Sequence, residues 1–520
     1  MAFASFICLY FQKNVVNNIF GVECRRCYQV VQGTKPSQEE NTMHIFNQGK
    51  YKSLHAQEVG ELDAVRQAVE LDQDFRPTYH LAPPTGLLND PNGLIFDGEK
   101  YHIFYQWFPY DALHGMKHWK HLMTKDFQTF AEADPLIPDE MFESHGCYSG
   151  GAILWQDKIV AFYTGNTRRA SDNQRVPHQN IAIFDKSGKL LEKRCIIDQA
   201  PQGYTEHVRD PKPFVTAEGK IRFVLGAQRE NLTGTGLLYE MDNLEATPRL
   251  LSEIAINDFD NSNVFMWECP DLFKLADKDL FVWSPQGKLR EATRFQNNYH
   301  ATYALGQLTG ATLTAEHIEE LDYGFDFYAP QTVQNAEGIL YGWVGLPDLM
   351  YPTDKYKWHS MLTMPRQLSV KQGKVFQQPV KEIYAQLQDK VSLSVNGITE
   401  VENLDTAYLQ FNVENQPLVI RFFDNEQGQN LTFRYENGLV TLDRSATDQT
   451  DLMKQFGEQR HCEVEKLENV EIFFDCSVVE IFLNDGEKAM TSRFFIKGRE
   501  NCLETSRLLE IISVNLLKEF

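Results

Sequence analysis

Three acidic residues, Asp90, Asp210 and Glu268, stand in similar polar motifs at intervals of about sixty residues, or a multiple of that, in this 520-residue chain. A lone Asp before Pro is usually a turn residue, and a lone Glu is usually solvated surface. Hydrolysis of a glycosidic bond needs two carboxylic acids, one to protonate the leaving oxygen and one to act on the anomeric carbon. Three acids that recur in equivalent motifs therefore indicate a glycosidase.

The acids belong to a longer repeat that must position them. Each copy runs polar motif, apolar run, turn, apolar run, and five copies are marked by Asp90, Ser149, Asp210, Glu268 and Phe327. A solenoid could accommodate such units, but a β-propeller explains more, because the first strand of every blade starts at the central channel. The repeat predicts that motifs far apart in the sequence converge on one axial pocket.

The segments of the chain differ in their pattern of apolar and polar residues. Residues 1–53 have no clear periodicity and are expected to be an extension, either disordered or an artefact of start-codon choice. Residues 54–75 are expected to be a helical lead-in, residues 76–380 the propeller and residues 381–520 a β-sandwich. Apolar residues near helical spacing support the lead-in: Val59, Leu62, Val65, Val69 and Leu71. Alternating runs support the sandwich, at 418–423, 431–435, 470–475, 477–483 and 493–496, with hairpin turns at 436–438 and 484–486.

The bulk properties exclude several classes of partner. The net charge is −22, from 50 basic and 72 acidic side chains, so binding to nucleic acid or to an anionic membrane is not expected. No window of ~20 apolar residues exists to span a membrane. The 9 cysteines are scattered and form no disulfide framework, which favours a reducing compartment, the cytoplasm. Cys24 and Cys27 lack a second pair at zinc spacing, so no metal site is predicted.

The polar motifs resemble the three signature motifs of glycoside hydrolase family 32. They read Leu88-Asn89-Asp90-Pro91-Asn92-Gly93, Arg209-Asp210-Pro211 and Glu268-Cys269-Pro270. The resemblance covers about residues 75–510, and within the family it is strongest to the bacterial sucrose-6-phosphate hydrolases. It implies an all-β fold, a five-bladed β-propeller followed by a C-terminal β-sandwich, in agreement with the repeat.

The resemblance also implies roles for individual residues. Asp90 resembles the nucleophile, Glu268 the general acid/base, and Asp210 the stabiliser of the transition state; no cofactor is needed. Arg209 is expected to hold the carboxylates by charge-assisted hydrogen bonds. Further expected contacts with a small-molecule sugar substrate are Asn89, Gln106, Tyr148 and Ser149, while Trp107 and Trp119 could equally stack on a sugar ring or fill the core.

One loop points to a phosphorylated sugar. The chain departs from the pattern of exported invertases at Phe108 and His114, and five basic residues follow closely in an acidic protein: His114, Lys117, His118, Lys120 and His121. We hypothesise that Lys117 and His118 bind the 6-phosphate, against the alternative of a solvated loop. A plain invertase, a fructan hydrolase, a fructosyltransferase and, remotely, a non-catalytic sugar-binding propeller remain alternatives, and the oligomeric state stays open.

Overall fold

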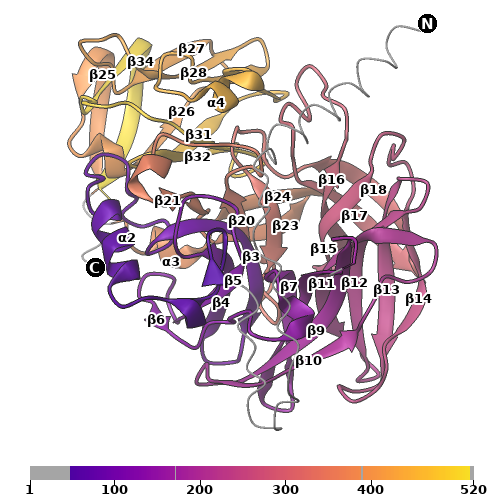
Figure 1. Cartoon of the computed structure of the whole chain (residues 1–520). Helices are drawn as coiled ribbons and strands as arrows, with labels where there is room; N and C mark the ends of the chain where they lie inside the picture. Colours follow the sequence, from indigo (N-terminus) through magenta and orange to yellow (C-terminus); the bar gives the residue numbers. More distant parts are fainter. Residues whose placement is uncertain (1–46, 170, 388–389, 516–520) are drawn as a thin grey trace, which may run out of the picture. The chain divides into compact units, whose positions relative to one another are not determined.

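The computed structural model describes residues 47–169, 171–387 and 390–515 (Figure 1). Within these ranges the chain is mostly β, as the sequence predicts. The α-helices of the described ranges are short: α2 (Glu61–Val69), α3 (Lys381–Tyr384) and α4 (Asp451–Gln455). The 3-10 turns are η1 (Leu54–Ala56), η2 (Met141–Glu143), η3 (Asp354–Tyr356) and η4 (Leu404–Thr406). Most of the expected extension 1–53, with Cys24 and Cys27, lies outside the described residues.

The lead-in to the sheets is less helical than its periodicity predicts. It contains η1 and α2, and a two-stranded ribbon of β1 (Asn47–Gln48) and β2 (Tyr51–Lys52) precedes it, at the end of the predicted extension. Only Val69 of α2 is buried, and the flanking Val59 and Leu71 are exposed. Gly60, with a φ of 77°, precedes the helix and excludes Val59 from it. The predicted apolar stripe therefore shortens to one helix of nine residues.

Each repeat of the sequence folds as an antiparallel meander. The first sheet has the order β21-β3-β4-β5-β6 and the second β10-β9-β8-β7. Their bounds are β3 (Gly86–Phe96), β4 (Tyr101–Phe108), β5 (His118–Thr124), β6 (Ala131–Glu132), β21 (Trp358–His359), β7 (Cys147–Trp155), β8 (Lys158–Arg168), β9 (Arg175–Asp185) and β10 (Leu190–Ile197).

An eight-stranded sheet contains the third and fourth repeats, in the order β11-β12-β13-β14-β18-β17-β16-β15. Its halves join through a parallel contact of β14 with β18. The bounds are β11 (Tyr204–Val215), β12 (Ile221–Arg229), β13 (Gly234–Met241), β14 (Arg249–Ile256), β15 (Met266–Leu275), β16 (Lys278–Gln286), β17 (Thr302–Thr309) and β18 (Thr312–Glu320). Each half is thus one meander, as in the other repeats.

The last repeat closes a ring with the first. It contains β19 (Tyr328–Thr332), β20 (Ile339–Val344), β22 (Met361–Leu362), β23 (Arg366–Lys371) and β24 (Lys374–Pro379). The first strands β3, β7, β11, β15 and β19 contact one another in that order, and β19 contacts β3. Strand β21 adds a parallel seam, in which Trp358 pairs with Gly86 and the Gly86 amide donates to the Lys357 carbonyl at 2.7 Å. The five strands that contain the polar motifs therefore surround one axis.

The C-terminal strands form a separate ten-stranded sheet system with its own apolar core. Its bounds are β25 (Val391–Glu400), β26 (Ala407–Asn412), β27 (Leu418–Phe422), β28 (Leu431–Glu436), β29 (Leu439–Asp443), β30 (Gln459–Glu463), β31 (Asn469–Asp475), β32 (Val478–Leu483), β33 (Lys488–Arg493) and β34 (Cys502–Asn515). Both predicted hairpin turns are present, with positive φ at Asn437 and Asp485. The strand predicted at 493–496 is wrong, because β33 ends at Arg493.

Buried charges join the sandwich to the propeller. Arg366 donates to Glu480 and, at 3.0 Å, to Asp322. His80 contacts Asp475 at 2.9 Å through Nδ1 and Glu480 at 3.0 Å through Nε2. Burial opposes the charge of His80, but the two carboxylates prevail and raise its pKa above the usual value. These buried ion pairs hold the sandwich in a fixed position against the propeller strands.

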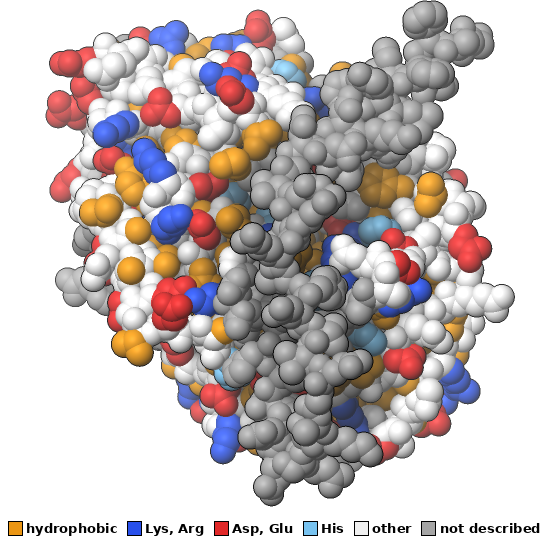
Figure 2. All heavy atoms as spheres, viewed as in Figure 1, with side chains coloured by type: hydrophobic (Ala, Val, Ile, Leu, Met, Phe, Trp, Pro, Cys, Tyr) orange, Lys and Arg blue, Asp and Glu red, His pale blue; other side chains and the backbone are white. Residues whose placement is uncertain are grey.

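One face of the molecule carries both signs of charge (Figure 2). On the face shown in Figure 2, acidic and basic side chains are interspersed. Within the described ranges, no helix has the length and apolar character to cross a bilayer. The same ranges contain no cluster of three His, Cys, Asp or Glu side chains arranged to hold a metal ion.

Candidate active site

Every first strand departs from regular pairing at its polar motif. The register shifts lie between Leu88 and Pro91, Cys147 and Gly150, Arg209 and Lys212, Glu268 and Asp271, and Tyr328 and Gln331. In three of the motifs the central residue has a positive φ: 66° at Asp210, 48° at Cys269 and 48° at Ala329. Bulges re-aim side chains, and positive φ in a non-glycine residue is strained, so these irregularities mark a functional site.

The bulges correct one point of the sequence interpretation. Asp210 and Cys269 occupy the same place, each with positive φ and each followed by proline. Glu268 therefore stands one residue earlier than the equivalent of Asp210, and matches Arg209 and Tyr328. Because neighbouring residues of a strand point in different directions, Glu268 approaches the axis from another side than Asp210.

Glu268 is held by four hydrogen bonds. Arg209 donates to its Oε1 from Nε at 3.0 Å and from a terminal nitrogen at 2.6 Å. Gln286 donates to Oε2 at 2.7 Å, and the Tyr328 hydroxyl donates to it at 2.6 Å. The side chain keeps 16% of its surface exposed, which leaves room for a ligand. Sequence reasoning missed Gln286 and Tyr328, although Tyr328 lies in the motif of the fifth repeat.

Asp90 stands at the centre of a second network. Ser149 donates to its Oδ2 at 2.5 Å and Asn89 to its Oδ1 at 3.0 Å. Gln106 accepts from Asn89 at 2.6 Å and donates to Ser149 at 2.5 Å, which closes the ring of polar contacts. Burial raises the pKa of Asp90, while the bonds from Ser149 and Asn89 oppose this shift.

Cys269 lies between the two aspartates. Its sulfur is 3.8 Å from Oδ2 of Asp90 and 3.7 Å from Oδ2 of Asp210, and its amide donates to the same Asp210 oxygen at 3.0 Å. Burial, with some contribution from Glu268 and against the attraction of Arg209, raises the pKa of Asp210 to about 7. The thiol has its own pKa raised well above the usual value by burial, so Cys269 is a small filler rather than a nucleophile.

Lys117 is the member of the basic loop whose amino group reaches this network. Its Nζ donates to Oδ1 of Asn89 at 2.7 Å and lies 3.0 Å from Nδ1 of His114. The side chain is 5% exposed. Burial lowers the pKa of Lys117 to about 7, against the attraction of Asp90. The amino group is therefore on the Asp90 side of the site.

The structure does not bring all predicted contacts to the site. Trp119 is fully buried among core residues and donates to the Tyr148 carbonyl at 3.2 Å. Trp107 is also in the core and donates to a backbone carbonyl at 2.6 Å. His118 is fully buried, with contacts of 3.0 Å to the Leu54 amide and to a backbone carbonyl. Its ring nitrogens are thus both occupied, which is incompatible with phosphate binding in this conformation.

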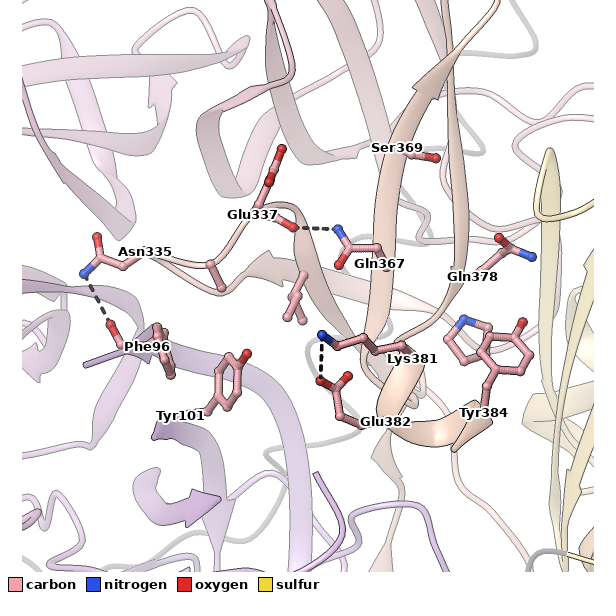
Figure 3. A pocket seen from close by; sticks show the side chains of 13 residues that line it. Phe96, Tyr101, Asn335, Glu337, Gln367, Ser369, Gln378, Lys381, Glu382 and Tyr384 are labelled. Carbon is pink, nitrogen blue, oxygen red and sulfur yellow. Dashed lines mark hydrogen bonds and ion pairs between the residues drawn. The ribbon is translucent and has the colours of Figure 1, made fainter. Parts of the chain in front are cut away.

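A pocket of about 560 Å³ lies away from these residues (Figure 3). Its lining comes from the end of β3, the start of β4, the β19–β20 connection, β20, β23, β24 and α3. In Figure 3 the carboxylate of Glu337 points away from Glu382, which lies 4.0 Å from Lys381. None of the predicted site residues lines this pocket, and its two carboxylates share no partner. The chemistry is therefore assigned to the axial site.

Comparisons with known proteins agree with this arrangement. Residues 80–379 match the glycosyl hydrolases family 32 N-terminal domain, and residues 374–511 match the family 32 C-terminal domain. A sucrose-6-phosphate hydrolase of Bacillus subtilis (strain 168) is 37% identical over 83% of this chain and 91% of that protein. One of Staphylococcus xylosus is 35% identical over 88% and 94%.

Solved structures are similar as well. The sucrose-6-phosphate hydrolase from Lactobacillus gasseri has a TM-score of 0.83 at 28% identity and covers 90% of this chain and 98% of that one. A β-fructofuranosidase of Bombyx mori, solved as a D63A mutant with sucrose, has a TM-score of 0.74 at 26% identity, over 89% and 99%. The propeller-plus-sandwich fold and the two family models together show that this chain belongs to glycosyl hydrolase family 32.

Proposed function

We propose that the chain is a retaining β-fructofuranosidase that hydrolyses sucrose 6-phosphate to glucose 6-phosphate and fructose, and that it also accepts sucrose. The observation that supports this proposal best is the convergence of Asp90, Asp210 and Glu268 around Cys269. The phosphorylated substrate is that named for several relatives.

The proposed reaction runs in two displacements. Asp90 attacks the anomeric carbon of the fructosyl group, the glycosidic bond breaks, and the leaving oxygen takes a proton from Glu268. A water molecule then gives its proton to Glu268 and its oxygen to the anomeric carbon, which releases Asp90. Arg209, Gln286 and Tyr328 orient the carboxyl group of Glu268 for both proton transfers.

The remaining polar groups would bind the fructosyl half. Asp210, fixed by the Cys269 amide, would accept hydrogen bonds from ring hydroxyls and stabilise the charge that develops on the ring. Asn89, Gln106 and Ser149 hold Asp90 in place and would present further polar atoms to the sugar. Tyr148, half-buried beside Ser149, would contact the leaving sugar.

Several expectations about the whole chain belong to the same proposal. We count the ring of first strands as five blades, with the eight-stranded sheet as two of them. The propeller would extend over residues 76–380 and the sandwich over 381–520. The free cysteines of the described ranges support a location in the cytoplasm. No cofactor enters the reaction, because the carboxylates perform all proton and covalent steps.

The proposal is tested by measuring kcat/KM for sucrose 6-phosphate and for sucrose on the purified protein. A strong preference for the phosphate ester is expected, together with β-configured fructose as the first product seen by NMR. Equal or better use of plain sucrose would make the protein an ordinary invertase. Loss of retention would contradict Asp90 as nucleophile, and turnover that survives Glu268→Gln would favour the non-catalytic alternative.

A further inference from the structure

Two arginines face each other at the end of the β8–β9 hairpin. Arg168 and Arg175 are direct partners in the antiparallel register. Like charges in that position repel and destabilise a strand pair. The pair therefore does not serve the stability of the hairpin, and an anion between the two guanidinium groups would relieve the repulsion.

The arginine pair adjoins the nucleophile side of the site through Tyr148. The guanidinium of Arg175 lies over the Tyr148 ring, 5.7 Å from its centroid. Tyr148 precedes Ser149, which donates to Asp90 at 2.5 Å. Both Arg175 and Tyr148 are half-buried, so the guanidinium lies at the rim of the site and not on the open surface.

The same pair adjoins the acid/base through β11, which packs against β8 and β9. His207 on β11 is 3.1 Å from Arg209, and Arg209 donates to Glu268 at 2.6 Å. Burial lowers the pKa of Arg175, Tyr148 and Glu206 oppose this shift, and Arg209 and Arg168 add to it. Arg175 therefore lies near both halves of the site, in ring contact with Tyr148 and within range of the charge of Arg209.

Neither arginine of this pair has a carboxylate in ion-pair contact within the described part of the chain. Arg168 donates only to a backbone carbonyl, that of Asn173, at 3.0 Å, and Arg175 makes no hydrogen bond or ion pair there. A half-buried guanidinium without an anion is costly. In a chain of net charge −22, two such arginines beside a catalytic site point to an anionic ligand.

We propose that Arg168 and Arg175 form the subsite for the phosphate of the leaving sugar, an inference that rests on the proposed function. Glu268 protonates the leaving oxygen, so the leaving half of the substrate lies near Glu268, whose partner Arg209 is close enough for its charge to act on Arg175. Guanidinium groups bind phosphate oxygens in a bidentate manner. Lys117, bonded to Asn89 on the Asp90 side, would instead face the fructosyl half.

The test compares Arg175→Gln and Arg168→Gln with Lys117→Met. Arg169→Gln is the matched control, because Arg169 is exposed on the same hairpin and pairs with Asp172 at 3.4 Å. For each, kcat/KM is measured for sucrose 6-phosphate and sucrose, and glucose 6-phosphate and glucose are compared as inhibitors of sucrose hydrolysis. The inhibitor readout reports binding of the phosphate without any turnover of the ester.

We expect Arg175→Gln to lower the ratio of kcat/KM for the ester to that for sucrose by about 10–100-fold, the loss of a charge-assisted bond. Inhibition by glucose 6-phosphate should weaken in parallel, and Arg169→Gln should change neither quantity. A preference that survives Arg175→Gln, or falls only in Lys117→Met, overturns this subsite alone. A wild-type enzyme without any preference overturns the proposed function, and the subsite with it.

Discussion

The buried carboxyl group of Asp210 should lower the free energy of unfolding at neutral pH, and the substitution Asp210→Asn should remove this effect. Burial raises the pKa of Asp210 to about 7, whereas an Asp in an unfolded chain titrates near 3.9. Below pH ~4 both states are protonated and no penalty exists. Between about pH 4 and 7 the unfolded state loses its proton first, so stability falls as pH rises through this window.

The size of the effect follows from the shift. About three units at ~1.4 kcal/mol each set an upper bound of roughly 4 kcal/mol. Because Asp210 shares its charge environment with Arg209, Glu268 and Asp90, we expect about 2 kcal/mol. On raising the pH from 4.5 to 7.5, the Tm of the Asp210→Asn variant should therefore increase by about 2–4 °C relative to the Tm of the wild type. The activity of this variant should be roughly 10²–10³-fold lower than that of the wild type.

The assay is thermal unfolding at equal scan rates at both pH values, with Asp271→Asn as the control. Asp271 is equally buried but pairs with Lys212 at 3.1 Å and accepts from Thr332 at 2.7 Å. Its loss leaves the buried Lys212 ammonium without a carboxylate partner, so the control should be destabilised by about 3 kcal/mol at pH 7.5. A Tm difference between Asp210→Asn and wild type that does not change with pH would refute the reasoning.

Three further predictions concern other groups. Glu268→Gln should reduce kcat for sucrose by roughly 10²–10⁴-fold but affect a nitrophenyl fructofuranoside much less, because that leaving group needs no proton; equal losses would speak against the acid role. Lys117→Met should move the acidic limb of the kcat/KM–pH profile to higher pH, because Lys117 lowers the pKa of Asp90; an unmoved limb would show that the two do not interact. His80→Gln should lower the unfolding free energy by about 3 kcal/mol in urea, because two buried carboxylates each lose their contact with the His80 ring; a loss under 1 kcal/mol would mean that these ion pairs are dispensable.

The sequence predicts best those features that recur with a period. The repeat, and the convergence of the three acids on one axis, could be predicted from residue types and spacing, because each first strand contains one polar motif. What the sequence could not supply are the bulges, which set Glu268 one position away from Asp210. A register shift depends on pairing with a partner strand, and no local pattern encodes it.

Side chains outside the motifs were harder to place. Trp119 and His118 are polar-tipped residues that satisfy their nitrogens within the core, and composition alone does not separate that role from ligand binding. Gln286 ends a strand with no flanking signal, so its contact with Glu268 appears only in three dimensions. Arg168 and Arg175 read as an ordinary polar hairpin until their register sets them opposite each other.

The seam between Trp358 and Gly86 also bears on how the enzyme comes into being during synthesis. All three acids precede residue 270, so a ribosome-bound or prematurely terminated chain can contain every one of them. Such a fragment still lacks Tyr328, which donates to Glu268, and it lacks β21, the strand that pairs with β3. We therefore expect catalytic activity to require the closed ring of strands, so that an activity measurement on a cell extract would count only molecules that have finished folding.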